Sequence, residues 1–110
     1  RFVAAGQSSS ENGYNSGGDI PPYSPNFYTN VIDKFPFASD ANATDVGDIT
    51  EARGYASGQS SNSNGYTSGG NSPPGAVLNI IEKFPFSTDA NATDVGDLTQ
   101  ARESASGQQV

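Results

Sequence analysis

The chain has 110 residues, of which only 33% are hydrophobic, and its formal net charge at pH 7 is −7. This acidic balance argues against nucleic acid or an anionic membrane as a partner, because both attract cationic protein surfaces. No segment approaches the roughly 20 consecutive apolar residues that a membrane-spanning helix needs, so we expect no membrane insertion. The absence of cysteine excludes disulfides and thiolate sites.

Strand signals occur four times in each half of the chain, and no segment shows sustained helical periodicity. In the first half the predicted strands are residues 2–6, 13–16, 30–35 and 44–47. In the second half they are residues 54–58, 65–68, 79–84 and 93–96. Within the third strand Val31, Asp33 and Phe35 share one face. Asp33 is the polar exception on that face, and we expect it at a strand end or paired with Arg53.

The two halves are copies of one another. Residues 34–59 and 83–108 are identical at 20 of 26 positions, with an offset of 49 residues. Upstream, residues 6–9 recur as residues 58–61 with an offset of 52. A repeat of about 50 residues predicts stacked units that cannot bury their apolar faces alone, so that neighbouring copies become part of the fold.

The duplication divides the chain into two units and a fragment. Unit 1 spans residues 1–52, unit 2 spans residues 53–101, and residues 102–110 repeat the opening strand of a third unit. The chain begins inside the repeat pattern and without an initiator methionine, so we expect a processed chain or a segment of a longer array. The extra strand could add to the edge of another chain, or it could only close a ring or fray.

The units resemble kelch repeats. Residues 14–18 are similar to the kelch strand that ends in a glycine doublet, and residues 46–53 resemble the closing segment. Residues 31–36 are similar to the aromatic strand, with Phe35 in the tyrosine position. The second unit repeats these matches through Gly69, Gly70, Phe84 and Arg102.

The resemblance implies a β-propeller architecture, although the tryptophan position of a kelch repeat holds Ala43 and Ala92 here. The expected fold is all-β: two tandem kelch-like four-stranded blade units plus the first strand of a third, completed by neighbouring copies. Because a propeller typically needs four to eight blades, two units imply a larger protein, a ring of subunits or a polymer. Such repeats also resemble those in phage and environmental bacterial surface proteins, and the fold alone does not choose a function.

An acidic segment occurs once in each unit, at residues 40–48 and 89–97. Its oxygen-bearing side chains lie at loop positions 1, 3, 5 and 9, which resembles the spacing of Ca²⁺ loops. The candidate ligands are Asp40, Asn42, Thr44 and Asp48 in unit 1, and Asp89, Asn91, Thr93 and Asp97 in unit 2. The sixth position is Asp45 and not the usual glycine. The alternative is therefore a turn without a cofactor, in which Asp and Asn cap their own backbone.

Two further kinds of site are suggested by side-chain type. Asn42 and Asn91 each begin an Asn-Ala-Thr sequence, which is an acceptor for N-glycosylation in a secretory pathway. Aromatic residues at fixed repeat positions are more typical of a core. Of these, we expect Tyr14 and Tyr66 nearest the surface, as candidates for binding glycans, because a phenol tolerates contact with water.

Catalysis is poorly supported, because the chain has no histidine and no cysteine and so lacks the usual base and nucleophile pairings. We expect a structural repeat protein and not an enzyme. It would form an extracellular filament, appendage or virion fibre through head-to-tail β assembly, with further copies of itself as partners. The alternative is a glycan-binding, lectin-like oligomeric propeller. Both predictions imply an extracellular, cell-surface or virion location.

Overall fold

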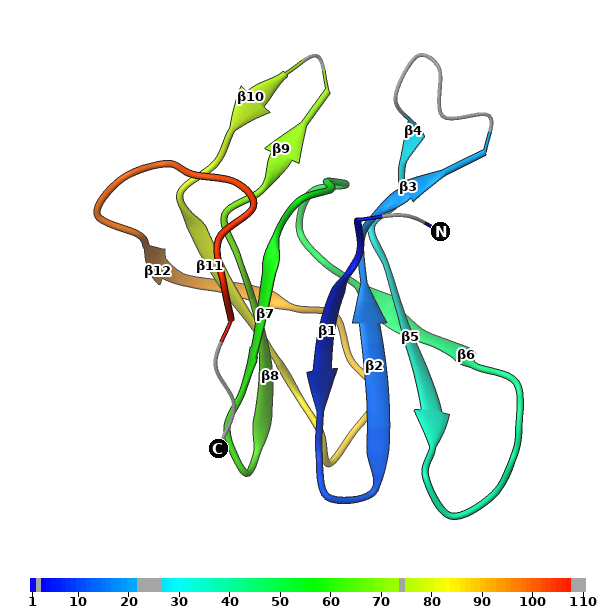
Figure 1. Cartoon of the computed structure of the whole chain (residues 1–110). Helices are drawn as coiled ribbons and strands as arrows, with labels where there is room; N and C mark the ends of the chain where they lie inside the picture. The colour runs from blue at the N-terminus through cyan, green and yellow to red at the C-terminus, as the bar shows by residue number, and fades with distance from the viewer. Residues whose placement is uncertain (2, 22–26, 74, 108–110) are drawn as a thin grey trace.

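A computed structural model describes the chain at residues 1, 3–21, 27–73 and 75–107. In these residues all regular structure is β-strand, and it forms two four-stranded antiparallel sheets and two short ribbons (Figure 1). The all-β prediction is therefore confirmed. Neither sheet closes on itself in the described part of the chain. The same residues contain no helix with the length and apolar character needed to cross a membrane.

The sheet of unit 1 is an antiparallel meander. Its strands, in hydrogen-bonded order, are β1 (Ala5–Ser8), β2 (Asn12–Ser16), β5 (Val31–Pro36) and β6 (Thr44–Asp48). Between β2 and β5 the chain leaves the sheet to form a ribbon of β3 (Asp19–Ile20) and β4 (Phe27–Tyr28). A bulge between Ile32 and Asp33 shifts the register of β5 against β6.

The sheet of unit 2 repeats this arrangement strand for strand. Its members are β7 (Ser57–Ser60), β8 (Asn64–Ser68), β11 (Ile80–Pro85) and β12 (Thr93–Asp97). Its ribbon consists of β9 (Asn71–Ser72) and β10 (Ala76–Val77). The bulge recurs between Ile81 and Glu82, which are the equivalents of Ile32 and Asp33.

The second, third and fourth predicted strands of each unit are confirmed to within one residue at either end. The first strand was predicted too early: β1 begins at Ala5 and β7 begins at Ser57, and residue 2 lies outside the described residues. The reason is a left-handed residue before each strand, Val3 with φ 53° and Tyr55 with φ 60°. An extended strand cannot continue through that backbone conformation.

The predicted opening strand of a third unit is not formed in residues 102–107, which run as irregular backbone. Residues 108–110 lie outside the described residues. The segment does have an ordered course, and it runs down beside β7 in Figure 1. Ser104 repeats the left-handed conformation of the two earlier unit starts, with φ 57°. Residues 102–107 therefore follow the path of a unit start without strand pairing.

Each sheet has two faces, which we name after their aromatic residues. The tyrosine face carries Gln7, Tyr14, Ser16, Ile32 and Ile49 in unit 1, and Gln59, Tyr66, Ser68, Ile81 and Leu98 in unit 2. The phenylalanine face carries Asn15, Asp33, Phe35, Phe37 and Ala43 in unit 1, and Thr67, Glu82, Phe84, Phe86 and Ala92 in unit 2. The hydrophobic core forms where the tyrosine face of unit 1 meets the phenylalanine face of unit 2.

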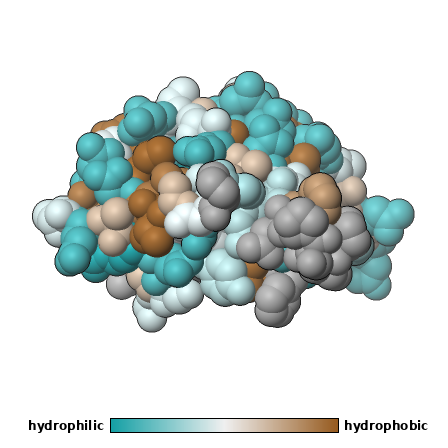
Figure 2. All heavy atoms as spheres, turned by 90° about the horizontal axis from the view of Figure 1, so that it is seen from above, coloured by the Kyte–Doolittle hydropathy of each residue, from teal (hydrophilic) through white to brown (hydrophobic). Residues whose placement is uncertain are grey.

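The two units pack most closely at β1 and β7, which lie side by side in Figure 1. A side chain at Gly58 would place its Cβ 2.1 Å from the carbonyl oxygen of Gly6. Glycine is therefore required at residue 58 for the two backbones to approach. Away from this contact, the surface seen from above is mainly hydrophilic or neutral, with small apolar groups, the largest on the side of unit 2 (Figure 2).

Candidate functional site

The main candidate site is the interface between the two units, and its centre is aromatic. Tyr14 from β2 lies edge to face with Phe84, with ring centroids 5.4 Å apart, and stacks on Phe86 at 5.0 Å. Each such pair contributes about 0.5–1.5 kcal/mol beyond area burial. Tyr14 is only 3% exposed, so its predicted surface position is wrong. Unit 2 covers the face on which Tyr14 lies, and this burial raises the pKa of its hydroxyl group.

A buried polar network lies beside the aromatic rings. The Nε2 atom of Gln7 is within hydrogen-bonding distance of Ser16 Oγ (2.9 Å) and Thr67 Oγ1 (3.0 Å). The same atom also reaches the carbonyl oxygen of Tyr66 at 2.9 Å. The hydroxyl groups of Ser16 and Thr67 are 2.9 Å apart and form a further bond across the interface. Because these groups are buried, an incorrect register between the sheets would leave them unpaired, and the network therefore fixes how the units meet.

An ion pair joins the linker between the units to the sheet of unit 2. Glu82 accepts hydrogen bonds from Thr50 N (2.7 Å), from Thr50 Oγ1 (2.9 Å) and from Nη2 of Arg53. Arg53 also donates through Nη1 to the carbonyl oxygen of Gly69 at 3.0 Å. The side chains of Arg53 and Glu82 are both fully buried. Burial lowers the pKa of Arg53 below its usual value, while the carboxylate of Glu82 opposes that change.

The predicted pairing of Arg53 with Asp33 is wrong. Asp33 instead pairs with Arg1, at 2.6 Å, and Arg53 pairs with Glu82. Arg1 and Arg53 are equivalent residues, as are Asp33 and Glu82. The arginine at the start of each unit therefore pairs with the acidic residue on the third long strand of the same unit, β5 or β11.

Two polar contacts close the outer edge of the interface. Lys34 Nζ lies 2.8 Å from a carboxylate oxygen of Asp89, and this hydrogen bond raises the pKa of Lys34. The backbone N–H of Asp48 donates to Asn91 Oδ1 at 2.9 Å. Residues of the proposed calcium sets thus connect the two units to one another.

The tight loop expected for calcium binding is not what the structure contains. Thr44–Asp48 is strand β6, and its counterpart Thr93–Asp97 is strand β12. An extended strand rises about 3.3 Å per residue, so the two ends of either five-residue strand lie about 13 Å apart. Ligands of one Ca²⁺ ion lie within about 2.6 Å of it, so each predicted set of four does not converge. Among the described residues no cluster of three or more acidic, His or Cys side chains suited to a metal is found.

The backbone capping expected in the alternative interpretation of the acidic segment occurs at one residue in each unit, although both residues lie on strands and not in a turn. Asp45 Oδ1 accepts a hydrogen bond from Gly47 N at 3.1 Å. Asp94 Oδ1 accepts the equivalent bond from Gly96 N, also at 3.1 Å. Both predicted N-glycosylation residues, Asn42 and Asn91, are exposed.

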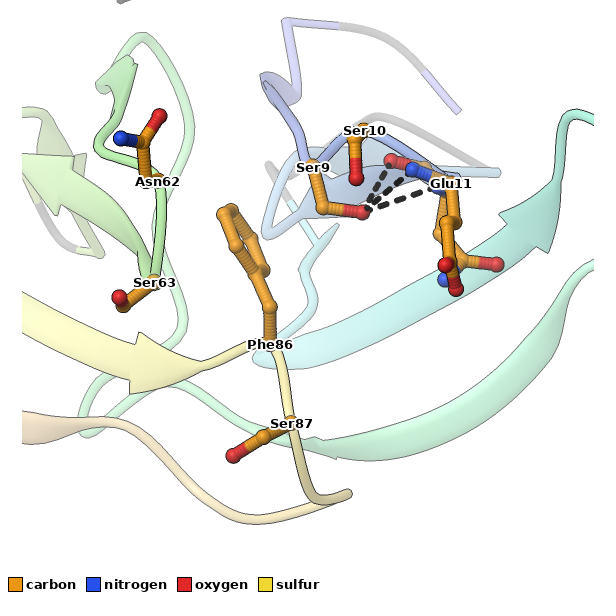
Figure 3. Close-up of a pocket in the computed structure, with 8 residues that line it drawn as sticks. Ser9, Ser10, Glu11, Asn62, Ser63, Phe86 and Ser87 are labelled. Carbon is orange, nitrogen blue, oxygen red and sulfur yellow. Dashed lines mark hydrogen bonds between the residues drawn. The ribbon is translucent and has the colours of Figure 1, made fainter.

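A polar cleft at the loop end of the interface was missed by sequence reasoning. It has a volume of about 320 Å³ and is lined by Ser9, Ser10, Glu11, Asn12, Asn62, Ser63, Phe86 and Ser87. In Figure 3 the ring of Phe86 stands between the loop that carries Ser9 and the loop that carries Asn62. Its walls come from both units, so no single segment of sequence reveals it. The serine-rich loops were the only signal.

Comparison of the sequence with family models gave no match, and no curated protein matched it. The functional argument therefore depends on the geometry of this chain.

Proposed function

We propose that the chain is a structural repeat module whose units stack face to face into an extended extracellular assembly, such as a filament, an appendage or a virion fibre. The observation that carries this proposal is the interface between units 1 and 2. It joins a tyrosine face to a phenylalanine face, and every unit has one of each. A repeat with two complementary faces has no built-in stop, so further units can be added at either end.

The resemblance to kelch repeats supports the same proposal. Each unit is a four-stranded antiparallel meander, which is the form of a propeller blade. Face-to-face contact between different surfaces is heterologous, and it closes into a ring when the rotation permits or otherwise grows a filament. The net charge of −7 suits such an assembly in an open aqueous environment.

Electron microscopy of the purified chain over a range of protein concentrations tests this function. We expect regular fibres whose length increases with concentration, and sedimentation velocity should show the matching growth in mass. A chain that stays monomeric at every concentration would exclude the proposed function. Small closed rings would favour the alternative function below.

The alternative is a glycan-binding oligomer, and the observation that favours it is the cleft in Figure 3. Hydroxyl, amide and carboxylate groups around one aromatic ring are the chemistry that binds sugars. A bound sugar at 100 times its Kd would stabilise the fold by about 2.7 kcal/mol. Thermal unfolding with a panel of monosaccharides and oligosaccharides tests this. A shift that disappears in Asn62→Ala supports sugar binding, and no shift with any sugar removes it.

A further inference from the structure

The tyrosine face of unit 2 is a more open copy of the buried tyrosine face of unit 1. The five residues of the tyrosine face in unit 1 are each at most 3% exposed, because unit 2 packs on them. Their equivalents line an open cavity of about 270 Å³ formed by Gln59, Tyr66, Ser68, Ile81 and Leu98. The same kinds of side chain thus form a core in one unit and a hollow in the next.

The phenylalanine face of unit 1 is the exposed counterpart of the buried phenylalanine face of unit 2. Phe84 is 2% exposed, whereas its equivalent Phe35 is 36% exposed, and Phe37 is 54% exposed. The rings of Phe35 and Phe37 lie 6.1 Å apart at 76°, and those of Phe84 and Phe86 lie 6.0 Å apart at 78°. The exposed pair therefore already has the arrangement that the buried pair uses to hold a tyrosine.

The polar and charged contacts of the internal interface also have uncovered counterparts. Gln59 donates to Ser68 at 2.9 Å within its own sheet, as Gln7 does to Ser16 at 2.9 Å. In place of Thr67, unit 1 presents Asn15, which also has an acceptor oxygen.

Opposite charges occupy the corresponding places at the two open ends. Lys83 is the equivalent of Lys34, and Asp40 is the equivalent of its partner Asp89. In the same way, Arg102 and Asp33 correspond to the buried pair described above. Lys83 and Asp40 therefore supply the two halves of one ion pair, whereas Asp33 is already paired with Arg1 of its own chain.

Residues 102–107 mark where a further unit would begin. Gly70 N donates to the carbonyl oxygen of Arg102 at 2.9 Å, as Gly18 N donates to that of Arg53 at 2.8 Å. This segment therefore lies on unit 2 in the same way that the start of unit 2 lies on unit 1. The start of a further unit therefore lies next to the open tyrosine face of unit 2, as the start of unit 2 lies next to the buried tyrosine face of unit 1.

We infer that the tyrosine face of unit 2 binds the phenylalanine face of unit 1 in a second copy of this chain. The inference rests on the proposed function and specifies which surfaces meet. Phe35 and Phe37 of the second copy enclose Tyr66 of the first, as Phe84 and Phe86 enclose Tyr14. Residues 1–6 of the second copy and residues 102–107 of the first are equivalent segments, and one of them holds the position at the start of the unit. Such an exchange replaces a segment by its equivalent and so costs little.

Two variants that each block one face test this inference. Phe37→Asp places a charge on the phenylalanine face of unit 1, and Tyr66→Asp places one on the tyrosine face of unit 2. Each variant alone should fail to grow beyond the monomer, because every contact between copies needs both faces. Mixed in equal amounts, they should form one dimer of twice the chain mass, since each supplies the face that the other lacks.

Sedimentation velocity measures the masses, and circular dichroism checks that each variant keeps its β-sheet signal. Phe37 is largely exposed, so its replacement leaves the core in place. Leu98→Asp is a second variant of the tyrosine face, for use if Tyr66→Asp does not fold. Val77→Asp is the matched control, because Val77 is an exposed apolar residue of β10 that belongs to neither face. The control should assemble like the native chain.

The outcomes separate this inference from the proposed function. A dimer in the mixture but in neither variant alone supports the docking of these two faces. If both face variants assemble as the native chain does, the inference is overturned, while fibres of the native chain would leave the structural function standing. If the native chain does not associate at any concentration, both are overturned. A dimer in the mixture, with only closed rings from the native chain, supports the docking but excludes a filament.

Discussion

The replacement Glu82→Gln should weaken the contact between the two units more than its small change in size suggests. Glutamine keeps the shape of the side chain but removes its negative charge. Only one of its two terminal atoms can accept a hydrogen bond, whereas the carboxylate of Glu82 uses both oxygens to hold Thr50 and Arg53. The guanidinium group of Arg53 would then be buried without a counter-charge.

The expected loss in free energy of unfolding can be estimated from the burial of the Arg53–Glu82 pair. Both side chains have no exposed surface, and removal of one partner from a buried ion pair costs about 3–5 kcal/mol. Single domains are stable by only about 5–15 kcal/mol in total. The variant should therefore lose a large share of its free energy of unfolding, and its urea midpoint should fall by roughly 1 M or more.

Equilibrium unfolding in urea measures this loss, and the equivalent pair in unit 1 supplies the control. Arg1 and Asp33 are joined by the same kind of bond, but their side chains are 21% and 27% exposed. Asp33→Asn should therefore cost no more than about 1 kcal/mol. Equal, small losses in Glu82→Gln and Asp33→Asn would refute the argument, because burial would then make no difference to the pair.

A double variant separates the charge from the packing. Arg53→Met combined with Glu82→Leu removes both charges and fills the same space with apolar atoms. Replacing a whole buried pair in this way is often neutral or stabilising, so the double variant should recover most of the stability that Glu82→Gln loses. A double variant that is as unstable as the single one would show that the hydrogen bonds to Thr50 matter more than the charge.

Three further predictions concern other parts of the interface. Gly58→Ala should destabilise the fold by about 1–3 kcal/mol, because its methyl group would overlap the backbone of Gly6. Gly6→Ala, with 4.0 Å to the nearest atom, should leave the thermal midpoint unchanged. The free energy of unfolding should fall as the pH rises past about 10, because burial raises the pKa of Tyr14 and the unfolded chain loses that proton first. Tyr14→Phe should flatten this part of the profile of stability against pH, measured by urea unfolding. An unaltered slope would show that Tyr14 is not the group responsible. Lys34→Met should cost no more than about 1 kcal/mol, and the cost should shrink in high salt, since Lys34 and Asp89 are partly exposed; a larger loss that salt does not change would point to a role other than the ion pair.

The strands were predictable from sequence because their signals are local. Alternation along β5 and the recurrence of aromatic residues at fixed repeat positions locate most strands without knowledge of the packing. The left-handed turns at Val3 and Tyr55 were missed, because neither residue type favours that backbone conformation. The loop conformation on which the calcium prediction depended was wrong for a related reason. Spacing alone does not say whether oxygen ligands lie on a loop or on a strand, and Thr44 lies on a strand.

The candidate site could not be predicted because it depends on position in the array. Tyr14 and Tyr66 are equivalent in sequence, yet one is buried in the core and the other lines an open cavity. The same holds for Asp33 and Glu82, which occupy equivalent strand positions but differ in burial. A pattern within one unit cannot show which neighbour covers it, and only the packing of the two sheets resolves the difference.

The uncovered phenylalanine face differs from the covered one mainly in its polar residues, and this bears on the strength of the proposed contact between copies. Asp33 is shorter by one methylene group than Glu82, so its carboxylate reaches less far toward the linker of the neighbouring unit. Asn15 replaces Thr67 in the polar network. The two phenylalanines are retained with nearly the same ring geometry. The contact between copies should therefore keep its aromatic centre but lose part of its polar frame. Internal pairs of units would then be permanent, and contacts between chains would form and break with concentration.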